Sequence, residues 1–511
     1  MTMTSMHSKQ SSGSEMEPQI KKRRPRAKES FEEPPLFEEI CTYITYGVLA
    51  VVGYVSDFLR FVGVKEGPRL KNDNFKMNRD YDMFYFRNIF RRAQDCFERP
   101  VASTPGPYID IWDRVSHDNN WTFELKSSST RCLNLGSYNY LGFAQSSGPC
   151  AEASQEATHQ YGAGSCSARK DLGTLSIHKE LEHLVAEFVG KPAAMVFGMG
   201  FATNSTNIPA LMGKGSLIIS DQLNHTSLIL GCRLSGSLIR TFKHNDMEGL
   251  EKVLRTAIIQ GRPRTRKPWT KIMIVAEGVY SMEGSLANLP KIVELKKKYK
   301  AYLYLDEAHS IGAMGETGRG VAEYWGVDPA DIDIMMGTFT KSFGASGGYI
   351  AATHEIVSHI RAYSHATTYA TGMPGPVAQQ IISSMSIIMG KDGTDDGQKR
   401  ILQLAENSRY FRTKLHEMGF IVYGNEDSPV VPVLTYNTTK TINFSRKMLE
   451  RKIATVCVGY PATPLSEGRI RICLSAAHTR EMLDYALKEI SEVGDMFMMK
   501  CSKRKKMKTQ T

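Results

Sequence analysis

The chain has 511 residues, of which 41% are hydrophobic and 23% are charged, as in an ordinary soluble globular protein with a sizeable core. Its net charge of +11 reflects basic runs near the two ends, at 21–24 and 503–506. Such runs are typical of solvated tails, and binding to anionic lipid is the alternative. No nucleic-acid module accompanies the charge, and the nine cysteines include no C-x-x-C pair. The sequence therefore argues against nucleic-acid binding, a disulfide framework and a metal site, and favours reduced thiols in the cytosol.

The first 64 residues contain the best candidate for a membrane contact. Residues 1–35 are rich in Ser, Lys, Arg, Glu and Pro without apolar periodicity, which predicts a disordered basic tail. The segment 36–64 is mostly apolar, and its uncharged run from Ile40 to Ser56 is about 17 residues long, at the lower limit for a span. A helix that crosses the membrane and a helix that lies in its interface therefore both remain open.

After a linker and arm at 65–133, short apolar runs alternate with helical stretches such as Met247–Gln260 and Pro290–Tyr299. Such alternation is typical of an α/β domain, and these runs suit a parallel sheet that is covered on both faces. The predicted strands are 193–197, 216–220, 271–276 and 301–306.

A proline-rich stretch at 373–376 divides the rest of the chain. We therefore expect a large parallel-sheet domain at 134–375, a smaller C-terminal α/β domain at 376–499, and a basic tail at 500–511.

The strongest chemical signal is a lysine among small and hydroxylated residues. Lys341 lies in Gly337-Thr-Phe-Thr-Lys-Ser-Phe-Gly-Ala-Ser-Gly-Gly348, directly after the apolar run 332–336. An aldehyde converts such an amine into a Schiff base, which is how enzymes usually anchor pyridoxal 5'-phosphate (PLP). Thr338 offers a hydroxyl, and the glycines allow the backbone to approach a phosphate. A lysine at an ordinary junction between strand and loop is the alternative.

A carboxylate upstream favours the cofactor hypothesis. Asp306 ends the predicted strand 301–306, at the edge where open α/β sheets bind ligands, and it can pair with a pyridine nitrogen. His309 follows three residues later and can reach the ring hydroxyl. Asp306-Glu-Ala-His309 also matches the acidic box of one helicase class. However, no G-x-x-x-x-G-K-[ST] phosphate loop precedes it, which argues strongly against that class.

Three weaker signals come from loops that follow predicted strands. Gly200 and Phe201 open a helical segment whose first amides can hold a phosphate, although a tight turn explains them equally well. His225 can lie against the cofactor ring, or be a structural histidine. Ser281 adds a hydroxyl after another strand, in a place where an ordinary turn also uses one.

Taken together, these residues resemble the α-oxoamine synthases, a family of PLP-dependent fold-type I enzymes of the aminotransferase type. The resemblance runs from about Asn134 to about Gly494, and within the family it is closest to the lysine-bearing long-chain-base subunits. Three stretches carry it nearly letter for letter: 198–204, 302–309 and 337–349.

The resemblance implies roles for the site residues. Lys341 becomes the Schiff-base lysine and catalytic base, Asp306 the partner of the pyridinium, His309 the contact to the ring oxygen, and His225 the stacking residue. Gly200, Phe201 and Thr338 hold the phosphate, with Ser281 nearby. Arg471 matches the arginine that binds the amino-acid carboxylate, and Arg469 is the neighbour with which it is most easily confused.

The implied reaction is the decarboxylative condensation of L-serine with palmitoyl-CoA to 3-ketosphinganine, the first step of sphingolipid synthesis. A related glycine-using enzyme, such as a 5-aminolevulinate synthase, is the alternative. The resemblance further implies a heterodimer with a related subunit that lacks the lysine, small regulatory membrane subunits, and a place on the endoplasmic reticulum membrane with the catalytic domain facing the cytosol. The stretch Ala366–Thr371 resembles the segment that crosses to the partner's cofactor.

Overall fold

The computed structural model describes residues 31–62 and 81–503. The expectations for residues 1–30, for the end of the apolar segment and the start of the linker at 63–80, and for most of the final basic tail lie outside these residues. The domain boundaries proposed from the sequence stay a prediction.

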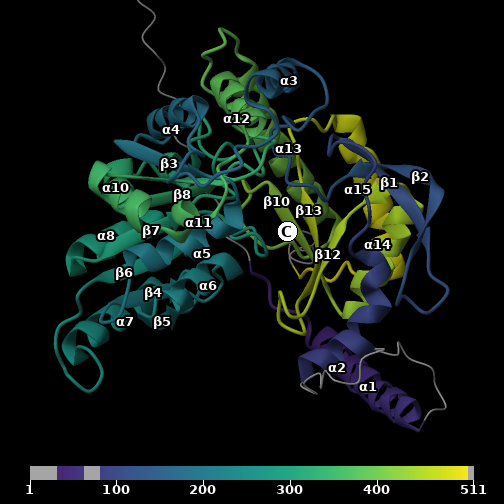
Figure 1. The fold of residues 1–511 in the computed structure, drawn as a ribbon. Coiled ribbons are helices and arrows are strands. Elements are labelled where there is room, and N and C mark those ends of the chain that lie inside the picture. The colour runs from purple at the N-terminus through teal and green to yellow at the C-terminus, as the bar shows by residue number, and fades with distance from the viewer. Residues whose placement is uncertain (1–30, 63–80, 504–511) are drawn as a thin grey trace, which may run out of the picture.

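A seven-stranded sheet forms the centre of the larger part of the molecule (Figure 1). Its strands, in order across the sheet, are β3 (Ala193–Phe197), β9 (Gly348–Ala352), β8 (Ile334–Thr338), β7 (Tyr302–Asp306), β6 (Ile272–Glu277), β4 (Leu217–Asp221) and β5 (Leu238–Phe242). β9 runs antiparallel to both of its neighbours, and the other pairs are parallel. The predicted α/β fold with a large parallel sheet is therefore confirmed, with β9 as an antiparallel strand that the sequence did not predict.

Helices cover both faces of this sheet because successive strand residues point to opposite sides. In β6, Met273 and Val275 enter one core cluster, whereas Ile274 and Ala276 enter the other. On the side of Met273 lie α5 (Gly200–Leu211), α6 (Thr226–Leu234), α10 (His354–Tyr363) and α11 (His365–Tyr369). On the side of Ile274 lie α3 (Pro149–Tyr161), α4 (Ser176–Val189), α7 (Met247–Gln260), α8 (Leu289–Tyr299), α9 (Gly320–Trp325) and α12 (Gly375–Ile388).

The C-terminal part is a second α/β unit. Its antiparallel sheet has the order β10 (Val430–Tyr436), β13 (Gly468–Cys473) and β12 (Val456–Val458), and its helices are α13 (Asp396–Met418), α14 (Thr438–Glu450) and α15 (Arg480–Met496). A hairpin of β1 (Tyr108–Val115) and β2 (Glu124–Asn134) joins this unit, since β2 pairs with β11 (Ile453–Ala454).

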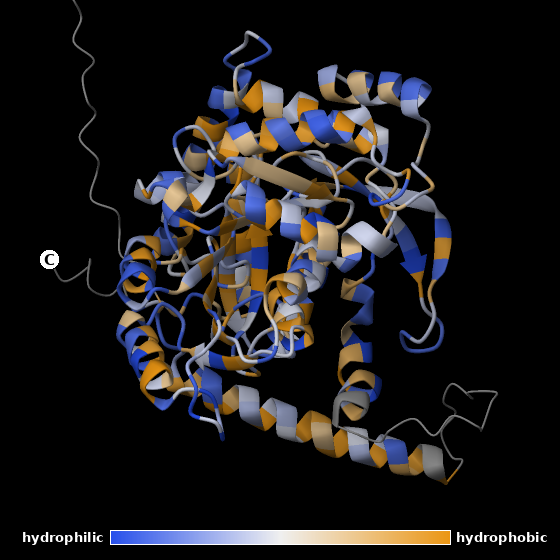
Figure 2. Cartoon of the chain, turned by 60° about the vertical axis from the view of Figure 1, so that its left-hand side comes forward, coloured by the Kyte–Doolittle hydropathy of each residue, from blue (hydrophilic) through white to orange (hydrophobic). Residues whose placement is uncertain are grey.

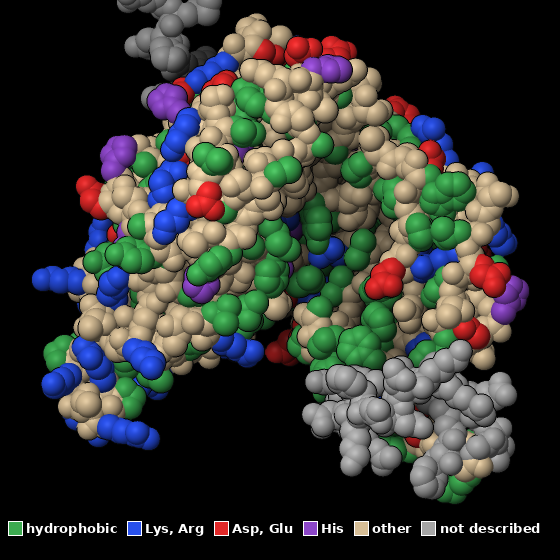
Figure 3. Space-filling model, in the orientation of Figure 1, with side chains coloured by type: hydrophobic (Ala, Val, Ile, Leu, Met, Phe, Trp, Pro, Cys, Tyr) green, Lys and Arg blue, Asp and Glu red, His purple; other side chains and the backbone are tan. Residues whose placement is uncertain are grey.

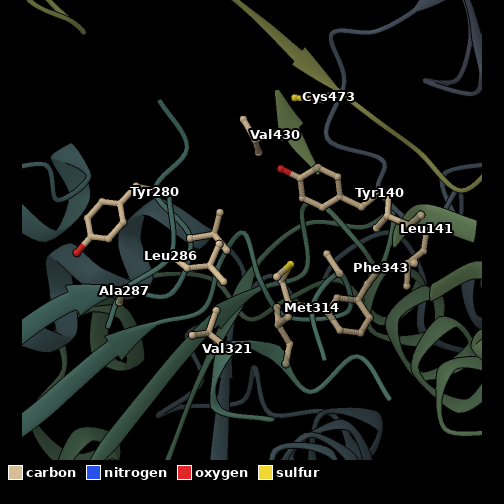
Figure 4. Close-up of a cluster of buried hydrophobic side chains, with 14 of the residues drawn as sticks. Tyr140, Leu141, Tyr280, Leu286, Ala287, Met314, Val321, Phe343, Val430 and Cys473 are labelled. Carbon is tan, nitrogen blue, oxygen red and sulfur yellow. The ribbon is translucent and has the colours of Figure 1, made fainter. Parts of the chain in front are cut away.

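One hydrophobic core connects the two units. Figure 4 shows Val430 and Cys473 of the C-terminal sheet near Tyr140, with Leu286 and Val321 of the larger part in the same cluster. Because these side chains pack continuously, loops from both units have fixed positions relative to each other. Figure 3 shows the molecule hollowed between the two parts, with hydrophobic and basic side chains on the walls.

The apolar N-terminal segment forms one long helix, α1 (Leu36–Phe61), which lies along the lower margin of the molecule in Figure 2. Among the described residues it is the one helix long and apolar enough to cross a membrane, and most of it is not buried in the protein. Its first half is held by an ion pair between Glu38 and Lys440 and by a hydrogen bond of 2.9 Å from Asn437 to Thr45. A short helix, α2 (Tyr81–Asn88), packs beside its second half, and η1 (Phe90–Cys96) follows.

We expect a double substitution Val48→Asp and Val51→Asp to release the chain from membranes. Both valines are more than half exposed on α1, and an aspartate at the centre of a bilayer costs about 3 kcal/mol. The measurement is the fraction of the protein that sediments with membranes. Leu125→Asp, the same kind of change at an exposed position of β2, is the control. An unchanged sedimenting fraction in the double variant would contradict the interpretation of α1 as the membrane contact.

Candidate active site

Two neighbouring strands bring the predicted lysine and aspartate to one edge of the large sheet. Asp306 is the last residue of β7, and its backbone pairs with Met336 of the adjacent parallel strand β8. Lys341 lies three residues beyond the end of β8. Because parallel strands end at the same edge, both side chains belong to the crevice at the carboxyl ends of the strands, as the sequence predicted.

Asp306 is buried and held by two hydrogen bonds. One carboxylate oxygen, Oδ1, accepts from the backbone N–H of Ala308 at 2.9 Å, and the other, Oδ2, accepts from Asn204 Nδ2 at 2.7 Å. Both partners are donors, which suits an ionised carboxylate. A carboxylate oxygen keeps a further lone pair, so Oδ2 can also accept from a ligand.

Lys341 is partly buried, and its ammonium lies 5.8 Å from the ring centre of Tyr138. Removal from water lowers the pKa of Lys341 to about 8, although the negative charges of Asp306 and Glu277 oppose the shift. The unprotonated fraction of the amine near neutral pH is therefore larger than that of an ordinary lysine, although the ammonium form still predominates. An unprotonated amine is the form that attacks a carbonyl or accepts a proton.

His309 lies in the same crevice and is buried. Its Nδ1 is 2.8 Å from the hydroxyl of Tyr140, and its ring lies 5.3 Å from that of Tyr138. Burial, together with the positive charges of Lys341 and Arg471, lowers the pKa of His309 well below its ordinary value. The imidazole is therefore neutral, with Nδ1 fixed by Tyr140, and Nε2 is left for another contact.

The predicted phosphate residues form a narrow cradle at the start of α5. A Cβ on Gly200 would lie only 2.7 Å from the hydroxyl oxygen of Thr338, so glycine is required for this approach. The Thr338 hydroxyl donates to the carbonyl of Gly347 at 2.9 Å. Phe201 meets the ring of His225 edge to face at 6.0 Å. The first amides of α5 therefore lie beside a hydroxyl and beside glycine backbone, groups that suit a phosphate.

The two arginines of β13 differ in what they bind. Arg469 is fully buried, and it donates to the carbonyl of Met282 at 2.9 Å and to Glu467 at 2.8 Å. The guanidinium of Arg471 instead lies 4.6 Å over the ring of Tyr138, and its buried Nε has no hydrogen-bond partner. Arg471 thus has donors available for an anion, whereas Arg469 is occupied in holding the turn that contains Met282. This contrast favours Arg471 for the carboxylate role.

Ser281 lies in that same turn, and its side chain is buried. Its neighbour Met282 contacts Arg471, with 3.9 Å between Sδ and Nη1. The turn therefore lies beside the site. Among the described residues, the Ser281 hydroxyl has no hydrogen bond that would define its role.

Sequence reasoning missed four residues of the site. Tyr138 and Tyr140 come from the loop after β2, and the tyrosine pair in Ser137-Tyr-Asn-Tyr140 was the only local signal. Glu277 ends β6, accepts a hydrogen bond from the backbone N–H of His225, and has its pKa raised by burial and by Asp306. Its place at a strand end was the same signal that identified Asp306. Asn204 lies inside the helix α5, and no local pattern distinguished it as a site residue.

Comparison with known proteins identifies the class to which this site belongs. Residues 130–490 match the model of the family described as aminotransferase class I and II. The match covers well over half of the chain, and the chain belongs to this family.

Relatives narrow the assignment to the serine palmitoyltransferases. The chain is 54% identical over 484 residues to serine palmitoyltransferase 3 of Homo sapiens, covering 94% of this chain and 88% of the relative. It is 51% identical over 463 residues to long chain base biosynthesis protein 2a of Arabidopsis thaliana, covering 90% and 94%. The chain therefore belongs to the serine palmitoyltransferase family.

Solved structures of similar proteins have the same fold. A serine palmitoyltransferase of S. paucimobilis with a bound PLP–myriocin adduct is 27% identical, with a TM-score of 0.70 over 82% of this chain and 100% of that one. The enzyme of Sphingomonas wittichii is 28% identical, with a TM-score of 0.71 over 82% and 98%. The predicted family and fold are confirmed.

Arg471→Lys should raise the concentration of amino-acid substrate needed for half-maximal rate by about tenfold, because one ammonium replaces a planar fork of donors. Initial rates over a range of substrate concentrations measure this. Arg469→Lys is the matched variant on the same strand, and it should lower the melting temperature more than it changes that concentration. A reversed pattern would move the carboxylate role to Arg469.

Proposed function

We propose that this chain catalyses the PLP-dependent decarboxylative condensation of L-serine with palmitoyl-CoA, which yields 3-ketosphinganine, carbon dioxide and CoA. One observation carries the proposal: a chain of the serine palmitoyltransferase family holds Lys341, Asp306, His309 and Arg471 around one crevice. The reaction makes the chain an acyltransferase at the first step of sphingolipid synthesis.

The residues of the crevice fit PLP. The narrow cradle of Gly200 and Thr338 suits a phosphate, and a free lone pair on Asp306 Oδ2 suits a protonated ring nitrogen. His309 keeps one ring nitrogen for the ring oxygen. When bound, PLP takes an amine covalently and withdraws electrons from the neighbouring carbon. The predicted cofactor therefore agrees with the geometry and with the family.

Each side chain then has a separate task in the reaction. The Lys341 amine, whose pKa is lowered by withdrawal from water, would hold the cofactor and afterwards take the α-proton of serine in its unprotonated form. Asp306 keeps a negative charge next to the ring nitrogen and so stabilises the electrons that the proton leaves behind. Arg471 binds the serine carboxylate until carbon dioxide is released, and His225 lies against the ring.

An apolar cavity of about 260 Å³ beside the crevice supports a long acyl chain as substrate. Arg471 and Met282 belong to its wall, so the cavity adjoins the reacting groups. The rest of the wall comes from α2, from η1 and the residues that flank it, from α14, and from β12 and the loop after it, namely Tyr85, Ile89, Phe90, Ala93, Phe97, Thr438, Thr441, Ile442, Cys457, Val458, Gly459, Tyr460, Pro461 and Ala462.

The assembly and the location belong to the same proposal. Tyr369 at the end of α11 is 79% exposed, and Leu172 in a nearby loop is 89% exposed. Lys170 N–H donates to Thr367 O, which links this loop to α11. Tyr369 also lies in Ala366–Thr371, the stretch that resembles the segment crossing to the partner's cofactor, and these two linked side chains suit a contact with a partner. We assign them to a heterodimer with a related subunit that lacks the lysine. α1 anchors the chain to the endoplasmic reticulum membrane, where small membrane subunits bind and the catalytic part faces the cytosol.

Lys341→Ala should abolish turnover and the visible absorbance of the bound cofactor while the protein stays folded, because the change removes the covalent anchor and the base together. Absorbance on adding serine or glycine, circular dichroism and product formation are the measurements. Lys214→Ala, at an exposed turn before β4, is the control. If Lys341→Ala still turns over substrate and borohydride traps the cofactor on another lysine, the assignment of Lys341 as the Schiff-base lysine is overturned. If the absorbance of the parent responds to glycine instead of serine, the proposed amino-acid substrate is wrong.

Co-expression with the lysine-free relative should raise solubility and activity well above those of the chain alone. The physical reason is that the partner covers the exposed apolar side chains and completes the site. Size-exclusion chromatography and the rate of 3-ketosphinganine formation measure both effects. A purified homodimer with the full rate would show that the heterodimer is not required.

A further inference from the structure

A buried chain of hydrogen bonds runs from the core of the large sheet to two residues of the site. It begins at Tyr304 of β7, passes through Asn204 of α5, and reaches Asp306 directly and His225 through Ser227. Tyr304, Asn204 and Ser227 are almost completely buried. Because each bond must have one donor and one acceptor, the chemistry at one end fixes the directions along the whole chain.

The carboxylate of Asp306 sets the orientation of the Asn204 amide. Asp306 accepts from Asn204 Nδ2 at 2.7 Å, and the opposite orientation would place a carbonyl oxygen against the carboxylate. The Tyr304 hydroxyl donates to Asn204 Oδ1 at 2.8 Å and thus holds the amide in this orientation from the other side. Burial raises the pKa of Tyr304 well above its ordinary value, so this hydroxyl remains a donor.

The second N–H of the Asn204 amide continues the chain to His225. It donates to the Ser227 hydroxyl at 3.0 Å, so the hydroxyl hydrogen of Ser227 is free to donate onward. That hydrogen points to His225 Nδ1, which lies 2.7 Å from the Ser227 oxygen and also accepts from the Ser227 backbone N–H at 3.2 Å. A ring nitrogen that accepts twice carries no proton, so the neutral imidazole carries its hydrogen on Nε2.

We infer that Asn204 and Ser227 are positioning residues that fix, through one polarised chain, both the orientation of the Asp306 carboxylate and the tautomer of His225. Neither side chain needs to touch the substrate. Asn204 occupies one lone pair of Asp306 Oδ2 and leaves the other for a ligand proton, and Ser227 leaves the hydrogen of His225 on Nε2, where it can be donated to a ligand. The inference rests on the proposed function, because it assigns the two target residues to the PLP and serine sites.

Asn207, one turn further along α5, shows what a purely structural asparagine does here. It is also fully buried, but its Nδ2 donates to the backbone carbonyl of Thr203 at 2.7 Å, within the helix. Its Oδ1 has no partner. Of these two buried asparagines on one helix, Asn204 alone has its amide satisfied by side chains that lead to the site. This difference makes Asn207 a matched control.

The first test uses Asn204→Asp in the assembled enzyme, with Asn207→Asp as the control. The change is isosteric, but it places a second carboxyl against Asp306, and two carboxyl groups this close cannot both be ionised. We expect kcat to fall about tenfold to hundredfold and the absorbance of the bound cofactor to shift. Asn207→Asp should lower the melting temperature without changing the absorbance. Equal absorbance and kcat in Asn204→Asp and the parent would overturn the inference.

The second test uses Ser227→Ala and Ser227→Thr, which separates the branch to His225 from the branch to Asp306. Without the hydroxyl, the tautomer of His225 is set only by the backbone, so KM for serine should rise by about tenfold while the spectrum without serine stays parental. Ser227→Thr keeps the hydroxyl and should restore KM. A rise in KM in both variants, or in neither, would overturn this branch.

The parent enzyme in the same assays separates this inference from the proposed function. If the parent shows no change in absorbance with serine, the proposed function fails. If the parent responds but the Asn204 and Ser227 variants respond like it, only the inference fails. If Asn204→Asp lowers the melting temperature as far as Asn207→Asp does and still leaves the absorbance equal to that of the parent, Asn204 is a structural residue. That result would overturn its positioning role.

Discussion

Withdrawal of one lysine from water is the constraint on which the rest of this structure depends. Lys341 keeps a pKa of about 8 because burial disfavours its charge, while Asp306 and Glu277 prevent a larger fall. An exposed lysine would be almost completely protonated at neutral pH, so its amine would be available to an aldehyde or a proton far less often. The sheet supplies this environment by ending three neighbouring strands, β6, β7 and β8, at the same edge.

The charges around this lysine are balanced across two structural units. The carboxylates come from strand ends of the large sheet, whereas Arg471 comes from β13 of the C-terminal sheet. The ring of Tyr138, from the loop after β2, lies 5.8 Å from the Lys341 ammonium and 4.6 Å from the Arg471 guanidinium. The continuous core between the units keeps this spacing constant, since a shift of one unit would change the electrostatic environment of the lysine.

The sequence predicted the parts of the fold and site that local patterns determine. Four apolar runs became β3, β4, β6 and β7 within about one residue, and Asp306 and Lys341 were identified from their places after such runs. β9 was missed because Gly348–Ala352 looks like the end of the glycine-rich lysine motif, and β5 because it is a half-exposed edge strand. Tyr140 and Asn204 reach the site only through contacts distant in sequence, which no local pattern contains. The choice of Arg471 over Arg469 likewise depends on which groups each guanidinium contacts in the folded chain.

The attachment of α1 has a consequence for how an acyl substrate is delivered. Tyr46 of α1 is hydrogen-bonded to Thr438, and Thr438 is itself part of the cavity wall. In the proposed membrane arrangement, the helix that contacts lipid is therefore joined directly to the wall of the proposed acyl cavity. A substrate that dissolves in the bilayer can reach such a cavity by lateral diffusion, without first dissolving in water. The rate then depends on the density of substrate within the membrane surface, so adding inert lipid would dilute the substrate even at constant bulk concentration.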